Sequence, residues 1–459
     1  MRAAPTLRRL PLVLIAALAA ACHDAPTDPL ARGSGTGADR LLSDAELATP
    51  TDPSAAPSDA AWVSWVKSHR EPIRSLTSTR FDDLRFLEPL LQGKRIVQLG
   101  ESGHGVREFD QAKVRLIRYL HEELGYDVIA FESGLYDCWS ANRQVATLTA
   151  TNLMRHCIFG VWHTAEVLPL FQYIKETQST AHPLTLAGFD IQASTVSENA
   201  GAPAFLESVI GRLDPDYAAR IRQLDAMFVA GRTTFAQSDA GLQAVATYDS
   251  LTAWFDAHAQ ALSAAFAADP QPARVARQLA FSRARYLRHL RAQTSEELTS
   301  YRDPGMADNL DALLTSIHPG KKVIVWAHNY HIQADRGHSY ENGDPSTGIA
   351  TMGTWVAQRH ASELYTVGLF MYRGTAADNA RRVYQVSAPS PNSLEATFYP
   401  VRLKHFFVDL SQAGAGSGTE WIRRVTISKD WGVTPLLQVI GDQYHGILFI
   451  DTTAPPDYI

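Results

Sequence analysis

The stretch Arg95–Gly105, RIVQLGESGHG, is the most informative part of the sequence for the fold. Its first half is a short apolar run typical of a buried strand. Its second half is a glycine loop that carries an acid, Glu101, and an imidazole, His104, three residues apart. An amphipathic helix follows, because apolar residues recur at i, i+3 and i+4 spacing over residues 109–124 before Gly125 ends the pattern. Strand, loop and helix begin a βαβ unit, where ligands bind beyond the carboxyl ends of the strands, so we expect chemistry at this loop.

Short apolar strands separated by helices continue along the chain. Continuous apolar runs predict six further strands, at residues 127–131, 184–189, 322–327, 364–371, 405–410 and 446–451. Strands that are apolar along their whole length and alternate with helices are typical of a parallel sheet covered on both faces. We therefore predict an α/β fold with a central, mainly parallel sheet flanked by helices.

Changes in composition divide the chain into five parts. We predict a signal peptide at residues 1–22, a disordered tether at 23–58, the first part of the α/β core at 59–195, a helical insertion at 196–300 and the second part of the core at 301–459. The tether is rich in alanine, proline, serine, threonine, aspartate and glycine and has no periodicity. In the insertion, strand patterns are absent, and alanine, leucine and arginine recur at helical spacing.

The N-terminus has the features of an export signal. A basic start with Arg2, Arg8 and Arg9 precedes an apolar run, Leu10–Ala21, which is too short to span a bilayer. Small residues then precede Cys22 in a pattern that resembles a bacterial lipoprotein cleavage site. We expect an exported cell-envelope lipoprotein that is held on the membrane only through lipid on Cys22, with plain secretion as the alternative.

Composition restricts the partners and leaves the state of two cysteines open. Of 459 residues, 45% are hydrophobic and 20% are charged, and the formal net charge of -6 does not favour nucleic acid as a partner. We expect a monomer that acts on a small molecule. Cys138 and Cys157 remain in an oxidising compartment, where they form either a disulfide or two buried free thiols.

Polar residues stand at the ends of four predicted strands. These residues are Glu101 with His104, Glu132, Asp190, and His328 with His331. We expect them to share one cleft, because the carboxyl ends of parallel strands lie at one edge of a sheet. A histidine held by a carboxylate is suited to be a general base toward water, whereas several histidines with carboxylates are suited to hold a metal that activates water. Lys113, on the following helix, either joins this cleft or extends to solvent.

A set of ordered motifs covers residues 90–451. They are Gly100-Glu101-Ser-Gly-His104-Gly105, then Glu108, Phe109 and Lys113, then Glu132, then Arg302, Asp303, Met306, Ala307 and Asn309, and then Trp326-Ala-His328-Asn329-Tyr-His331. With these motifs the sequence resembles the erythromycin esterase family, within a wider group that also contains haem-binding lipoproteins. Two positions depart from the family pattern, since Gly103 stands where the family often has threonine and Lys113 where it often has arginine. The loop does not fit a G-x-S-x-G serine nucleophile, because His104 stands where glycine is required.

The resemblance implies hydrolysis of a carboxylic ester or macrolactone by activated water, with macrolide resistance as a candidate role. It implies that His104 is the general base and that Glu101 or Glu132 orients it. It also implies that His328 and His331 bind or polarise the carbonyl oxygen. The expected substrate-binding residues are Lys113, Asp190, Arg302, Asp303 and Tyr330. No cofactor is implied.

Two other functions stay open at this point. Glu101, His104, Glu132, His328 and His331 are also candidate ligands of a divalent metal, such as zinc or manganese, in a metal-dependent hydrolase. The other alternative is a non-enzymatic lipoprotein that binds haem or another ligand through Tyr330 or His331. The acidic cluster argues against haem, because a slot for that ligand rarely contains several buried carboxylates.

The helical insertion is the candidate wall of the cleft. A polar site at strand ends needs neighbouring surface that excludes water and grips an apolar substrate. Residues 196–300 precede the His328 strand, and Arg302 and Asp303 come directly after them. We expect a helix to begin at Pro304, which would place these two residues at a hinge. The alternative is that the insertion only covers a face of the sheet.

Overall fold

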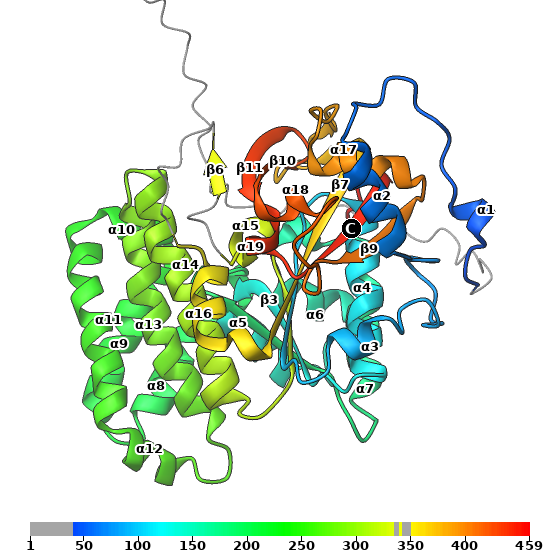
Figure 1. The fold of residues 1–459 in the computed structure, drawn as a ribbon. Helices are drawn as coiled ribbons and strands as arrows, with labels where there is room; N and C mark the ends of the chain where they lie inside the picture. Colours follow the sequence, from blue (N-terminus) through cyan, green and yellow to red (C-terminus); the bar gives the residue numbers. More distant parts are fainter. Residues whose placement is uncertain (1–39, 335–338, 342–349) are drawn as a thin grey trace, which may run out of the picture. The chain divides into compact units, whose positions relative to one another are not determined.

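The chain folds around a nine-stranded sheet, seen in a computed structural model that describes residues 40–334, 339–341 and 350–459 (Figure 1). The strands follow the order β1-β9-β12-β7-β2-β5-β3-β4, and β8 pairs with β7. Their bounds are β1 Arg70–Pro72, β2 Ile96–Leu99, β3 Val128–Gly134, β4 Thr185–Asp190, β5 Val323–Trp326, β7 Leu364–Ala377, β8 Val383–Gln385, β9 His405–Asp409 and β12 Gly446–Thr453. The pairs from β12 to β4 are parallel, and β9 and β1 extend one edge in antiparallel pairing. The predicted α/β fold with a mainly parallel sheet is confirmed.

All seven predicted strands are present, and the strands that sequence reasoning missed are short or partly polar. β1 and β8 have three residues each. A second, antiparallel sheet has the order β10-β11-β6, with β6 Ser339–Glu341, β10 Val425–Asp430 and β11 Thr434–Val439. β10 and β11 mix polar with apolar residues, so a search for continuous apolar runs does not find them.

Two hydrophobic cores lie on the two faces of the large sheet. In β3, Val128 belongs to one core and Ile129 to the other, and in β5 Val323 and Ile324 divide in the same way. This division arises because successive side chains of a strand point to opposite faces. Burial on both faces is what strands without polar alternation require.

Helices supply the cover for these two cores. They are α1 Asp44–Leu47, α2 Ala60–His69, α3 Leu87–Leu90, α4 Arg107–Glu122, α5 Leu135–Arg143, α6 Ala150–Cys157, α7 Leu168–Thr177, α8 Val196–Ile210, α9 Pro215–Ala230, α10 Arg232–Gln237, α11 Asp239–Ala257, α12 Ala259–Ala265, α13 Gln271–Arg291, α14 Ser295–Ala312, α15 Asn329–Ile332, α16 Met352–His360, α17 Leu394–Phe398, α18 Glu420–Arg423 and α19 Ile440–Gln443. Short 3-10 or π turns lie at Gly160–Trp162, Leu313–Ile317, Ala361–Glu363 and Tyr399–Val401.

The segment predicted as an insertion consists of helices α8 to α13 and the start of α14, drawn in green in Figure 1. These helices and the sheet belong to one compact unit, in which α14 contacts β4 and α13 contacts α5. The predicted helix start at Pro304 is wrong. The helix begins at Ser295, where Thr294 Oγ1 accepts from Glu297 N at 3.1 Å, and it continues through Pro304. Arg302 and Asp303 therefore lie inside a helix and not at a hinge.

The end of the predicted tether packs on the protein. α1 begins with a capping box between Ser43 and Glu46. Leu47 is fully buried, and its C=O accepts from Lys404 N at 2.8 Å. The prediction of a disordered tether up to residue 58 is therefore wrong for residues 40–58. The composition is tether-like, but backbone hydrogen bonds such as that from Thr49 N to Arg402 O, together with the cap and the buried leucine, hold this part on the protein.

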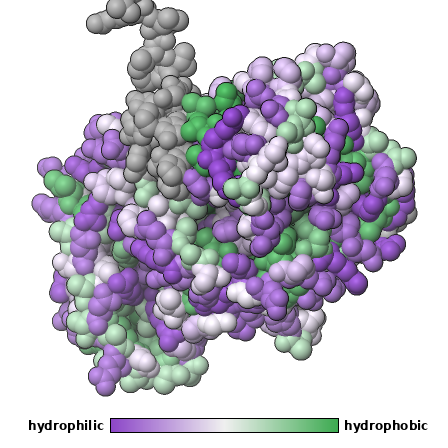
Figure 2. All heavy atoms as spheres, viewed as in Figure 1, coloured by the Kyte–Doolittle hydropathy of each residue, from purple (hydrophilic) through white to green (hydrophobic). Residues whose placement is uncertain are grey.

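Features connected with export are only partly within the described residues. The predicted signal peptide and Cys22 lie outside them. Cys138 and Cys157 form a disulfide that joins α5 to the end of α6, which decides between the two alternatives for these cysteines. In the part of the chain that the structure describes, no helix has the length and apolarity to cross a membrane. Figure 2 shows small groups of hydrophobic residues among hydrophilic ones on the visible face.

Candidate active site

The loop after β2 holds Glu101 and His104 in direct contact. Gly100 lets this loop approach α15, because a Cβ atom at Gly100 would lie 2.0 Å from Asn329 Oδ1. His104 Nδ1 donates to Glu101 Oε1 at 2.6 Å. A carboxylate only accepts hydrogen bonds, so this contact keeps the proton on Nδ1 and leaves a lone pair on Nε2 of the neutral ring.

Glu101 is fully buried, and its two oxygens bind three donors. Besides His104, Oε1 accepts from Trp162 Nε1 at 2.9 Å, and Oε2 accepts from Lys113 Nζ at 2.6 Å. Lys113 is fully buried as well and lies over the Trp326 ring, with Nζ 4.3 Å from its centroid. Burial lowers the pKa of Lys113, and the charge of Glu101 opposes that effect. Lys113 therefore does not extend to solvent, and its hydrogen bond to Oε2 holds the Glu101 carboxylate in place.

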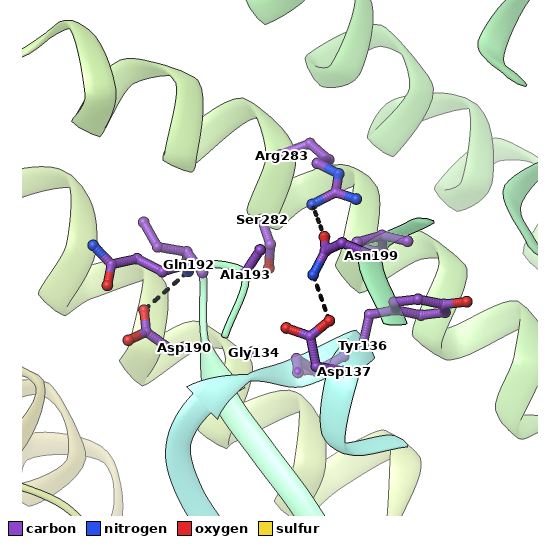
Figure 3. Close-up of a pocket in the computed structure, with 12 residues that line it drawn as sticks. Gly134, Tyr136, Asp137, Asp190, Gln192, Ala193, Asn199, Ser282 and Arg283 are labelled. Carbon is purple, nitrogen blue, oxygen red and sulfur yellow. Dashed lines mark hydrogen bonds between the residues drawn. The ribbon is translucent and has the colours of Figure 1, made fainter. Parts of the chain in front are cut away.

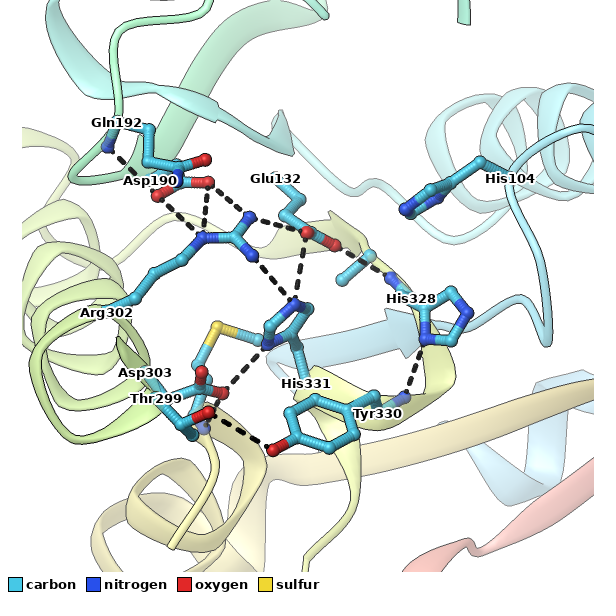
Figure 4. Close-up of polar contacts among 12 residues, drawn as sticks. His104, Glu132, Asp190, Gln192, Thr299, Arg302, Asp303, His328, Tyr330 and His331 are labelled. Atoms are coloured by element: carbon cyan, nitrogen blue, oxygen red, sulfur yellow. Dashed lines mark hydrogen bonds and ion pairs between the residues drawn. The ribbon is translucent and has the colours of Figure 1, made fainter. Parts of the chain in front are cut away.

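The ends of β3 and β4 supply two carboxylates that bind one arginine (Figure 4). Arg302, on α14, donates from Nη2 to Glu132 Oε1 at 2.8 Å and to Asp190 Oδ2 at 2.6 Å. Burial disfavours the charge on Arg302, but the two carboxylates outweigh burial and raise its pKa. Burial would raise the pKa of Glu132, but the charges of His331 and Arg302 outweigh it and the pKa of Glu132 is lowered. The three side chains form a paired, charged cluster at the carboxyl edge of the sheet.

Both ring nitrogens of His331 have protein partners. Nδ1 donates to Asp303 Oδ1 at 2.8 Å, and Nε2 lies 3.1 Å from Arg302 Nη1 and 3.3 Å from Glu132 Oε1. A neutral ring accepts from Arg302 at Nε2, whereas a protonated ring donates to Glu132. Burial disfavours the protonated ring, but Asp303 and Glu132 outweigh burial and raise the pKa of His331. His331 therefore links α14 to β3 and has no unused nitrogen.

His328 follows β5 and has a buried nitrogen without a partner. Its backbone N donates to Glu132 Oε2 at 2.8 Å, and its Nδ1 accepts from Tyr330 N at 3.1 Å. The neutral ring therefore has its proton on Nε2. This atom is buried, has no hydrogen-bond partner, and lies 3.8 Å from Asp430 Oδ1. Burial, together with nearby His104, lowers the pKa of His328 well below its ordinary value. The ring thus stays neutral and offers an N–H donor.

The two unused ring nitrogens belong to neighbouring imidazoles. The ring centroids of His104 and His328 are 5.0 Å apart. Figure 4 shows both rings on the same side of Glu132. Within the described part of the chain, no protein group hydrogen-bonds His104 Nε2. The His104 side chain keeps 13% of its surface exposed. A base that keeps some exposed surface and a buried, neutral hydrogen-bond donor therefore lie side by side.

The structure brings the predicted site residues together and changes some of their expected positions. Glu101, not Glu132, contacts His104, because Glu132 is bound to Arg302 and to the His328 backbone. A substrate-binding role does not fit Lys113, Asp190 or Asp303, since these side chains are buried and bound to Glu101, Arg302 and His331. Tyr330 is partly exposed, and its hydroxyl lies 3.4 Å from Thr299 Oγ1.

Sequence reasoning missed two tryptophans of the site. The Trp162 indole binds Glu101, and its ring meets His104 edge to face with centroids 5.1 Å apart. Trp431, in the turn between β10 and β11, stacks on His328 and contacts His104. Trp162 has no local signal. Trp431 has one, because a short segment that contains a glycine between two β-rich runs is a hairpin pattern.

A small internal pocket lies near Asp190, between the loop after β4 and helices α5, α8 and α13 (Figure 3). Asp137 accepts there from Ser194 N at 2.6 Å and Ser194 Oγ at 2.9 Å, and Asn199 Nδ2 also donates to it. Burial raises the pKa of Asp137 to about 6, although Ser194 opposes this. The pocket has a volume of about 10 Å³, room for roughly one water molecule, so it is not a substrate site.

The candidate metal ligands are engaged with one another and with the protein. Among the residues that the structure describes, no three histidine, cysteine or acidic side chains are grouped as a metal-binding set. Glu101 and His331 have their polar side-chain atoms bound to lysine, arginine, tryptophan, histidine or aspartate partners. The metal-dependent hydrolase stays a prediction that metal analysis must test.

Comparisons with known proteins agree on one family. The family model for erythromycin esterase matches residues 121–453. YbfO, a proposed hydrolase of Bacillus subtilis (strain 168), is 32% identical over 425 residues, which cover 87% of this chain and 93% of that protein.

Solved structures agree in fold. A crystal structure of a Bacillus cereus protein superposes with a TM-score of 0.73 at 19% identity, covering 86% of this chain and 98% of that one. A mutant of the erythromycin esterase EreC in its open conformation superposes with a TM-score of 0.64 at 20% identity, covering 82% of this chain and 95% of that one. At these identities the structures show a shared fold only. The family model and the relative at 32% identity show more: the chain belongs to the erythromycin esterase family and is a hydrolase.

Proposed function

We propose that this protein hydrolyses a carboxylic ester or lactone with a water molecule activated by His104. One observation supports this most strongly. His104 has Nδ1 held by Glu101 at 2.6 Å, and its free Nε2 belongs to a ring next to His328, whose Nε2–H is buried without an acceptor. Ester hydrolysis needs a base for water and a donor for the oxyanion, and these two rings offer one of each.

The proposed hydrolysis has two steps, attack of water and loss of the alcohol. His104 Nε2 takes a proton from water while the water oxygen attacks the carbonyl carbon. The negative charge that develops on the carbonyl oxygen accepts a hydrogen bond from His328 Nε2–H. The tetrahedral intermediate then breaks its bond to the alcohol oxygen, which takes the proton from His104. The products are a carboxylic acid and an alcohol, and no acyl-enzyme forms.

Residues behind these rings prepare them for their tasks. Glu101 stabilises the imidazolium form of His104, and Lys113 and Trp162 keep the carboxylate in place. Glu132 accepts hydrogen bonds from the His328 backbone N and from Arg302. It therefore holds the His328 backbone in place and so positions the Nε2–H that donates to the oxyanion. His331 has both nitrogens engaged, so we assign it a positioning role in place of the carbonyl contact expected from the family resemblance.

The acyl and alcohol groups of the substrate require a panel of probes. Two Escherichia coli relatives are named as type II and type I erythromycin esterases and match 28% and 12% of this chain. We include macrolactones for this reason, together with simple esters.

The deciding experiment compares the unaltered protein with His104→Ala on macrolides and p-nitrophenyl esters. Loss of a general base is expected to lower kcat/KM by about a hundredfold or more, with little change in the melting temperature. Equal rates for the two proteins would refute the proposal. Chelation followed by elemental analysis belongs in the same experiment, because loss of activity that returns only with a divalent metal would favour the metal-dependent alternative.

A further inference from the structure

The turn between β10 and β11 carries a backbone outlier beside the two imidazoles. Trp431 has φ 52° and Gly432 has φ 68°, and the turn closes through Val433 N donating to Asp430 O at 3.1 Å. Glycine and asparagine are the usual residues at positive φ, and a bulky side chain there is a rare outlier. Residues held in such conformations cluster at active sites and ligand clamps. A tryptophan in this unfavourable backbone conformation therefore needs a structural reason.

The contacts of the indole supply that reason. Trp431 stacks on His328 with ring centroids 5.2 Å apart and planes 26° apart. It also meets His104 nearly at a right angle, with centroids 5.2 Å apart. The indole is partly exposed, as is His104, so a molecule that approaches His104 from solvent passes beside it.

Gly103 leaves the room that the indole occupies. A Cβ atom at Gly103 would lie 3.5 Å from Trp431 Cε3 and 3.6 Å from Met371 Cε. A methyl group there would make ordinary contact, whereas a branched side chain would crowd the ring. The loop that carries His104 and the turn that carries Trp431 are thus packed against each other with room for a methyl group at Gly103.

We propose that Trp431 is a specificity-determining residue that limits which acyl groups reach His104. This inference rests on the proposed ester hydrolysis. A large aromatic wall beside the base favours a small or flat acyl group and disfavours a bulky one. The side chain acts by shape, so its removal should change the preference between substrates more than the chemistry on a small one.

Trp431→Gly is the main test, because glycine adopts φ 52° without strain and so keeps the turn. The probes are p-nitrophenyl acetate and p-nitrophenyl cyclohexanecarboxylate, which share a leaving group and differ in acyl size. We expect the ratio of kcat/KM for the bulky ester to that for acetate to rise about tenfold or more. Gly103→Ala should leave the ratio nearly unchanged, because its methyl group makes only ordinary contact with the indole.

Asn392→Gly is the matched control, since Asn392 is exposed and has φ 57°. It should not alter the ratio. A ratio that stays within about twofold in Trp431→Gly would overturn the inference.

A second readout does not depend on hydrolysis. Diethyl pyrocarbonate modifies unprotonated imidazole nitrogens, and peptide mapping by mass spectrometry follows the modification of His104. Trp431→Gly should be modified at His104 about threefold faster or more, and an unchanged rate would also overturn the inference. If neither ester is hydrolysed, the proposed function fails, and the modification rate still decides whether Trp431 restricts access.

Discussion

Two buried polar clusters in this molecule both pair carboxylates with cationic side chains. They differ in whether all of their hydrogen-bonding atoms have partners. One cluster lies at the strand ends and contains Glu101, His104, Lys113, Glu132 and His328. The other lies among the helices of the insertion and α5, and we call it the helical network. It consists of Asp137, Asn199, Asp225, Tyr248 and Arg283, all of them buried.

Every polar side-chain atom of the helical network has a partner. Asp225 accepts from Tyr248 Oη at 2.7 Å and from Arg283 Nε at 2.9 Å, and Arg283 Nη1 donates to Asn199 Oδ1 at 2.9 Å. In the cluster at the strand ends, by contrast, His328 Nε2 is buried without a partner. Leaving a buried donor unpaired costs about 1–3 kcal/mol, and a ligand that accepts from His328 Nε2–H would remove this cost. Between these two clusters, the difference is the unpaired donor of His328 and not the presence of buried charge.

The largest expected difference between the two clusters is in activity. Glu101→Gln removes the negative charge that stabilises the imidazolium form of His104. Its amide has one acceptor oxygen in place of two, so its NH₂ group faces either Lys113 or His104 Nδ1–H, and both of these are donors. We expect kcat/KM to fall on the order of a thousandfold. Asp225→Asn, the matched change in the helical network, should leave kcat/KM of the folded protein within about threefold. Similar losses in both variants would show that the comparison does not separate site from scaffold.

The next effect is on stability and runs in the opposite direction. Asp225→Ala leaves the Arg283 guanidinium buried without its ion-pair partner, so we expect about 3–5 kcal/mol of destabilisation. His104→Ala should cost less, because Glu101 keeps Lys113 and Trp162 as donors. Chemical denaturation measures both. Replacing the pair together, as Asp225→Leu with Arg283→Met, should recover part of the loss. The double variant removes the unpaired buried charge, and it leaves only the neutral atoms Tyr248 Oη and Asn199 Oδ1 without these partners. A double variant as unstable as Asp225→Ala would contradict this account.

The smallest effect concerns pH. The pKa of Glu132 is lower in the folded protein than the ordinary value of 4.5, because His331 and Arg302 outweigh burial. A lowered folded-state pKa contributes stability that is present above about pH 4.5 and is lost as the pH falls below it. The unaltered protein should therefore lose stability between about pH 5 and pH 3 more steeply than Glu132→Gln. The difference should reach at most about 1.4 kcal/mol per pH unit, which is one proton. Parallel stability curves over this range would show that Glu132 is not held as an anion.

Much of the fold follows from local patterns in the sequence. The seven apolar strands and the helix after the first glycine loop are visible because the spacing of apolar residues reports which face of an element is buried. The convergence of Glu101, Glu132, Asp190 and His328 follows from one further rule, that parallel strands end at the same edge of a sheet. The hairpin of β10 and β11 was missed because its strands mix polar with apolar residues and contain no continuous apolar run, yet the glycine in its short turn was a usable signal.

The α/β class, the strand ends that hold the site and the residue types available there follow from the sequence alone, because each depends on neighbours within a few positions along the chain. Tertiary packing sets how these residues are paired. It assigned Glu101 to His104 and Glu132 to Arg302, turned Lys113 inward, and brought Trp162 and Trp431 to the imidazoles. Such pairings join elements far apart in sequence. They depend on which donors and acceptors meet when the helices and the second sheet pack. A local sequence pattern does not contain that information.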